Sequence, residues 1–141
     1  MIVDIDDADH VARYCSPRKI KEDGTPAPGA FRFRDYDNCC LSVNWLECFR
    51  GQSIVDNILH VRSELCQHRE LRKNGRLAVL NVGKVKRAIK ITNKLDTNVK
   101  RSPRNNHRSH ACIGGYPTNN NEVVMTLSEM VGVDDMYNTT S

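Results

Sequence analysis

Hydrophobic residues between positions 53 and 71 recur every three or four residues, which is the spacing of one helix face. Ser53 stands just before this stripe and Asp56 follows three residues later, a common signal for the start of a helix. The pattern predicts an amphipathic helix over 53–71. Its apolar face consists of Ile54, Ile58, Val61 and Leu65.

Two shorter segments show the same helical period. Over 84–92, hydrophobic residues share one side and lysines the other, so we expect a helix that packs on a sheet with its ammonium groups outward. Over 119–131, Asn119 and Glu122 form a capping signal ahead of an apolar stripe, and Gly132 is the expected stop.

Three segments have the pattern of strands. His10–Cys15 is short, and Phe31–Arg34 alternates phenylalanine with arginine, as a half-buried strand does. Leu77–Val82 is almost continuously apolar, which favours a strand that is covered on both faces. We expect long loops at 16–30 and 93–109, because proline, glycine and asparagine interrupt any period there.

Residues 39–49 allow two interpretations. As a strand, the segment places Leu41, Val43 and Trp45 on one face and two polar residues, Ser42 and Asn44, on the other. Alternatively, the strand stops at Val43, and Asn44 caps a short helix in which Glu47 is the reciprocal partner. We prefer the second interpretation, because it gives both Asn44 and Glu47 a role.

These elements predict an α+β fold with a small sheet, mostly antiparallel or mixed, covered by about three helices. The chain has 141 residues, the size of one compact domain, which we place at 1–133 with a flexible tail at 134–141. Its composition is 39% hydrophobic and 27% charged, which excludes wholesale disorder, a collagen-like chain and a polytopic membrane protein.

The six cysteines predict a reducing environment rather than a disulfide framework. The amino terminus is acidic where an export signal is basic and then apolar, and no apolar stretch reaches the ~20 residues that span a bilayer. We therefore expect a cytoplasmic protein with reduced, mostly buried thiols and no membrane partner.

Charge is distributed unevenly along the chain. Residues 84–108 contain nine basic residues and a single acidic one, whereas 109–141 contains no lysine or arginine. A concentrated cationic segment attracts phosphate-bearing partners, so we expect this helix and loop to bind nucleic acid or a nucleotide. The candidate phosphate-binding residues are Lys84, Lys86, Arg87, Lys90, Lys94, Lys100, Arg101, Arg104 and Arg108.

Two other binding chemistries have weaker support. The Gly83–Lys84 junction before a helix has the form of an anion site, but it lacks the full pattern of a phosphate-binding loop. Cys66, His68, His107, His110 and Cys112 have side chains that can bind Zn²⁺, but their spacing fits no standard zinc module. We predict no metal and no cofactor.

A second hypothesis is an enzyme that acts on a nucleotide-like substrate. His110 is its central residue, because it stands in a polar loop ahead of two glycines, and Glu47, Ser42 and His10 are further candidates for catalysis. A third hypothesis is a non-catalytic interaction module, in which the acidic tail and the basic loop dock onto a partner or onto each other in a homodimer.

Overall fold

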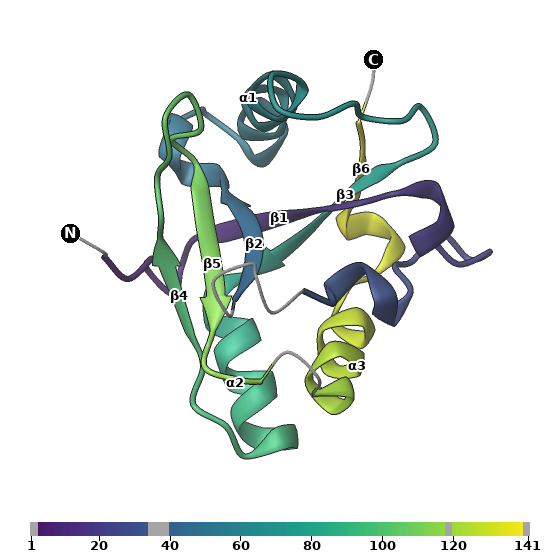
Figure 1. Ribbon diagram of the computed structural model, residues 1–141, viewed down its shortest axis with the longest axis vertical. Coiled ribbons are helices and arrows are strands. Elements are labelled where there is room, and N and C mark those ends of the chain that lie inside the picture. Colours follow the sequence, from purple (N-terminus) through teal and green to yellow (C-terminus); the bar gives the residue numbers. More distant parts are fainter. Residues whose placement is uncertain (1–2, 34–39, 118–119, 140–141) are drawn as a thin grey trace.

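A computed structural model describes residues 3–33, 40–117 and 120–139. Within these ranges, the strands form one sheet in the order β4-β5-β2-β1-β3-β6, with every neighbouring pair antiparallel (Figure 1). This arrangement confirms the predicted α+β class. The strands are β1 (His10–Cys15), β2 (Leu41–Trp45), β3 (Arg76–Asn81), β4 (Asn98–Arg101), β5 (His110–Gly114) and β6 (Met136–Asn138); the helices are α1 (Ile54–Cys66), α2 (Val82–Asn93) and α3 (Asn121–Met130).

The sheet lies between two layers of helix (Figure 1). Helices α2 and α3 cover one face, where side chains such as Val11, Val43 and Ile89 form the larger core. Helix α1 covers the other face, and its residues Val61 and Leu65 pack on β1 and β3 in a smaller core. This smaller core does not extend over β2 and β5. On the side of the sheet that α1 covers, those two strands therefore present polar side chains.

The starts of α1 and α3 lie within one residue of their sequence signals, whereas α2 begins at Val82, two residues before the predicted start, with Asn81 as its cap. Ser53 caps α1, because its hydroxyl accepts a hydrogen bond from the Asp56 amide (3.1 Å). The prediction for the last helix was wrong by one residue: Asn120 caps α3 by accepting from the Val123 amide, and Asn119 lies outside the described residues.

The preferred interpretation of 39–49 was wrong and the strand interpretation is correct. Strand β2 continues to Trp45, so Asn44 is a buried strand residue and caps no helix. The turn that follows, η3 (Leu46–Phe49), is a single 3-10 turn, and the Glu47 side chain bonds His10 instead of a helix terminus. Tertiary partners for Asn44 and Glu47 outweigh the local capping signal.

Other local predictions also change. Phe31 ends a 3-10 turn, η2 (Pro28–Phe31), where we expected a strand at 31–34, and Arg34 lies outside the described residues. Strand β4 occupies part of the predicted loop 93–109. Residues 134–141, which we expected as a tail, include β6, which pairs with β3.

The cysteines differ from the expectation of reduced, mostly buried thiols. Cys40 and Cys112, on neighbouring strands, form a disulfide. Cys15 is a buried free thiol, whereas Cys66 is exposed at the end of α1 and not on its apolar side. No helix in the described part of the chain is long and apolar enough to cross a membrane.

Candidate functional site

A cleft of about 340 Å³ opens on the half of the sheet that α1 leaves uncovered. Its floor is formed by β1, β2 and the first residue of β5, and one wall is the end of α1 with the residues that follow it. The connection between β4 and β5 forms the opposite wall. We call this cavity the histidine cleft, after His68, His107 and His110, which line it together with Ser42 and Asn44.

The cleft exists because β1 and β2 separate. They pair only at Val11↔Trp45 and Ala12↔Asn44. Beyond this point the Arg13 guanidinium fills the gap, since it donates to the backbone carbonyls of Ser42 (2.9 Å) and Ala30 (2.9 Å). The fork of donors on an arginine suits several carbonyls at once. Arg13 therefore links the two strands where their own ladder ends.

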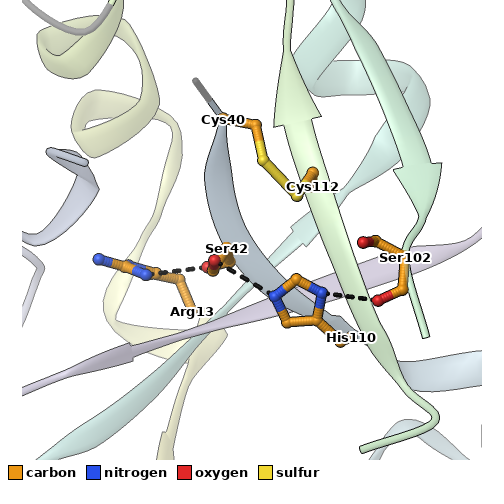
Figure 2. The surroundings of a disulfide bond; sticks show 6 residues. All are labelled: Arg13, Cys40, Ser42, Ser102, His110 and Cys112. Carbon is orange, nitrogen blue, oxygen red and sulfur yellow. Dashed lines mark hydrogen bonds between the residues drawn. A yellow bond between two sulfur atoms is a disulfide. The ribbon is translucent and has the colours of Figure 1, made fainter. Parts of the chain in front are cut away.

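Ser42 and His110 lie next to each other on the floor of the cleft (Figure 2). The His110 Nδ1 atom is 2.9 Å from the Ser102 carbonyl oxygen, and its Nε2 atom is 3.3 Å from the Ser42 hydroxyl. A carbonyl oxygen only accepts hydrogen bonds, so Nδ1 carries the proton of the neutral ring and Nε2 has a free lone pair. Nε2 is thus a base that faces a hydroxyl group.

Burial favours the neutral form of this base. His110 is only 3% exposed, and burial lowers its pKa, although the hydrogen bond to Ser102 opposes the shift. Burial also lowers the pKa of His107, against the opposing effect of the nearby Glu64 carboxylate. Both imidazoles are therefore neutral at neutral pH, the state in which a histidine accepts a proton.

A buried polar network holds the β4–β5 connection against the sheet and α1. The Ser109 amide (3.0 Å) and hydroxyl both donate to the Glu64 carboxylate. The Asn44 amide group donates to the Ser109 hydroxyl and to His107 Nε2, both at 2.9 Å. These bonds fix the backbone on both sides of Ser109, and thereby the positions of His107 and His110.

The walls of the cleft add rings and positive charge. The His107 ring stacks on His68 with centroids 4.7 Å apart and meets His110 edge to face at 5.2 Å. Arg69 lies over the Tyr14 ring, and Arg104 stands exposed on the connection between β4 and β5. With the imidazoles of His107 and His110 neutral, the arginines make the mouth of the cleft attractive to an anion.

The four predicted catalytic residues separate into two pairs. Ser42 and His110 share the histidine cleft. His10 and Glu47 form their own ion pair, Nδ1 to Oε2 at 2.8 Å, and neither lines this cleft. Glu47 also accepts from the His10 backbone amide, so it closes the turn after β2 onto β1. The structure thus brings together half of the predicted catalytic group.

The nine predicted phosphate-binding cations do not form one surface. Figure 1 shows α2 at one end of the sheet and the tip of the β4–β5 connection at the other. Two of the α2 lysines are engaged, Lys86 with Asp7 and Lys90 with Asp96. Lys84 and Arg87 are exposed on α2, and Lys94 is exposed at its C-cap; Lys100 and Arg101 lie on β4; Arg104 lines the histidine cleft; Arg108 lies beyond it on the connection.

The Gly83–Lys84 junction does not offer free amides to an anion. The Gly83 amide donates to the Asp7 carbonyl (2.9 Å), and the Lys84 amide donates to the Asn81 side chain (2.9 Å). The chain's own acceptors therefore occupy the donors that an anion would use. Among the described residues, no three histidine, cysteine or acidic side chains gather in a way that could hold a metal ion.

Sequence reasoning missed several residues of the site. The local sequence of Asn44 indicates a helix cap, and nothing in the sequence around Glu64, on the buried side of α1, indicates a chemical role. His107 was considered only as a metal ligand. The turn Asn105–Asn106 was the one available clue, because asparagine tolerates the left-handed backbone that Asn106 adopts (φ 59°) in a tight hairpin.

The chain matches no protein-family model, no curated protein and no solved structure. The fold and the site therefore assign this protein to a structural class and to no known family. It is an α+β domain with a six-stranded antiparallel sheet in its described part, and a serine–histidine pair lies on the floor of an open cleft.

Proposed function

We propose that the histidine cleft binds a phosphate-bearing, nucleotide-like substrate and that His110 acts on it as a general base. One observation carries this proposal: the Nδ1 bond to Ser102 leaves His110 Nε2 unprotonated, 3.3 Å from the Ser42 hydroxyl, in a cleft whose rim carries arginines. A base held in one tautomer beside a hydroxyl is an arrangement suited to proton transfer.

The proposed reaction is hydrolysis at phosphorus. A water molecule bound beside the Ser42 hydroxyl gives a proton to His110 Nε2 as its oxygen forms a bond to phosphorus. The ester bond breaks, the leaving oxygen takes up a proton from solvent, and the protonated His110 releases its proton to solvent, which restores the neutral base. Arg104 and Arg69, both exposed at the rim, would neutralise the charge of the phosphate group.

From the sequence we expected the whole basic segment 84–108 to bind phosphate; we now propose that its part at the histidine cleft, and not its part on α2, does so. Arg104 is the member of that segment that lines the histidine cleft together with a candidate base. None of the α2 cations lines the histidine cleft, and two of them are engaged with aspartates. Binding of the phosphate at the cleft, rather than along α2, is therefore the form of the hypothesis that the geometry favours.

The test uses His110→Asn with bis(4-nitrophenyl) phosphate as the hydrolysis probe. Asparagine keeps a donor for the Ser102 carbonyl but has no basic nitrogen, so we expect kcat to fall by about 10²-fold or more. His10→Asn, in the separate pair that His10 forms with Glu47, is the matched control and should keep full activity. Arg104→Ala should raise KM and change kcat little.

A second readout follows adenosine 5′-monophosphate. We expect it to shift the ring signals of His107 and His110 in NMR spectra of the native chain, and to do so less in Arg104→Ala. The proposal is wrong if His110→Asn hydrolyses the probe as fast as the native chain, or if the native chain neither turns over the probe nor shows these shifts.

A further inference from the structure

A second hollow of about 340 Å³ lies on the far side of His107. His107 lines both cavities, so the histidine cleft and this second space, which we call the outer hollow, adjoin at the His107 side chain. Arg104 belongs to the cleft and Arg108 to the outer hollow. The two guanidinium groups are thus placed in successive cavities along one connection.

The outer hollow contains a stack of flat groups drawn from three parts of the chain. The Phe49 ring at the end of η3 stacks on the His60 ring of α1, with centroids 5.2 Å apart and planes 17° apart. The Arg108 guanidinium lies over the same Phe49 ring at 5.0 Å. His60 and Arg108 are exposed, so the stack is open to solvent at both ends.

Stacked rings beside guanidinium groups have a well-defined chemical preference. Bases of single-stranded nucleic acid stack on aromatic rings and on arginine planes, while cations along the groove contact the phosphates. The Glu64 carboxylate also lines the outer hollow, but it accepts two hydrogen bonds from Ser109, which spread its charge into the network. The exposed charged group in this hollow is therefore the cation Arg108.

We propose that the outer hollow is a second nucleotide subsite, so that the substrate of the histidine cleft is a single-stranded oligonucleotide and not a free mononucleotide. This inference rests on the proposed function of the cleft. One phosphate lies at Arg104 beside His110, the next at Arg108, and the intervening base packs on the stack of His60, Phe49 and Arg108.

The experiment measures binding of fluorescently labelled U6 and dT6 by anisotropy, with adenosine 5′-monophosphate as a competitor. We expect the better-bound hexamer to bind at least 10-fold more tightly than the mononucleotide. Arg108→Ala and His60→Ala, both at exposed positions, should each weaken hexamer binding about 5- to 10-fold and leave mononucleotide binding unchanged.

Salt dependence separates a phosphate contact from a loss of packing. Arg108→Ala should reduce the slope of log Kd against log salt concentration by about 0.7, the value for one released counterion on a single strand. The matched control is Lys84→Ala with Arg87→Ala on α2, which should leave both the affinity and the slope as they are. Equal weakening by the α2 variants would overturn the inference.

The two proposals fail in different ways. If the mononucleotide binds and His110→Asn still abolishes hydrolysis, but hexamers bind no more tightly than the mononucleotide, then only the second subsite is wrong. If hexamers bind through Arg108 but His110→Asn leaves hydrolysis unchanged, then the outer hollow is a binding surface and the assignment of the base is wrong.

Discussion

The chemistry of the histidine cleft depends on which ring nitrogen of each histidine carries a proton. For His110 this is set by the carbonyl of Ser102, and for His107 by the amide of Asn44, which donates to Nε2. Both hydrogen-bond partners are uncharged, and burial is the largest influence on both pKa values, although the Glu64 carboxylate, 3.7 Å from His107 Nε2, opposes the shift for that ring. The two rings therefore resist protonation. His110 stays available as a base at neutral pH, and the native state loses stability in acid, because the unfolded chain binds these protons more readily.

The pH dependence of stability provides a direct check. Since the native pKa of His110 is lowered, the unfolded chain binds its proton first as the pH falls below about 6.5. The stability due to the neutral ring is complete above that pH, declines below it, and is fully lost once the pH is under the native pKa. Urea unfolding between pH 8 and 5 should show the native chain losing stability relative to His110→Asn, which lacks this group.

The same titration governs activity in the proposed reaction. Hydrolysis of bis(4-nitrophenyl) phosphate should persist below pH 6.5 and fall only near the lowered native pKa of His110. For the unfolding experiment, a difference in stability between the native chain and His110→Asn that does not change with pH would contradict a lowered pKa of His110.

Among the secondary-structure elements, the junction of β1 and β2 most directly shapes the site. Their ladder stops after the Ala12↔Asn44 pair, and beyond it the Ser42 carbonyl of β2 accepts a hydrogen bond from the Arg13 guanidinium. Arg13 thus holds the two strands together while they stay far enough apart to leave room for the cleft. The separation leaves Ser42 with its hydroxyl in the cleft, in reach of His110.

We predict that Arg13→Lys destabilises the fold by about 1–3 kcal/mol. A lysine keeps the charge but cannot donate in fixed directions to the Ala30 and Ser42 carbonyls together. The urea midpoint should fall, and Ser42 should move relative to His110, so that activity decreases as well. Arg18→Lys, at an exposed position in η1 (Pro17–Lys19), is the matched control. Equal midpoints for the two variants would show that Arg13 does not hold the junction.

Sequence patterns predicted the helices better than the strands around the site. The apolar stripe and the Ser53 cap identify α1, because both are local features of one segment. Neither signal exists for β4, whose four residues pair with β5 across a hairpin. Asn44 shows the reverse problem: its local sequence favours a helix cap, but in the fold its side chain bonds the distant residues His107 and Ser109 instead.

At the scale of the entire chain, residues near the C-terminus form one edge strand of the sheet, β6. Strand β6 pairs with the edge of β3, and the Thr139 hydroxyl, only 2% exposed, donates to the carbonyls of Arg72 (2.7 Å) and Gly75 (3.2 Å). The Arg62 side chain of α1 in turn donates to the Thr139 carbonyl (3.1 Å). Three distant parts of the sequence therefore meet at this point.

Truncation after Asp135 should consequently cost about 2–4 kcal/mol, since it removes the β6 ladder and uncovers the edge of β3. Thr139→Val, which keeps the shape of the side chain but removes its hydroxyl, should cost about 1 kcal/mol. Thermal unfolding measures both. A truncated chain as stable as the full one would show that β6 adds nothing to the sheet.

The sequence by itself determined the α+β class and the approximate positions of the helices, because hydrophobic periodicity and capping are local properties of a segment. It also singled out His110 and Ser42 as candidate residues. Tertiary structure alone decided that they meet, that His10 and Glu47 pair elsewhere, and that the cations of 84–108 occupy opposite ends of the sheet. Those outcomes depend on strand order and register, which arise from contacts between residues far apart in the chain.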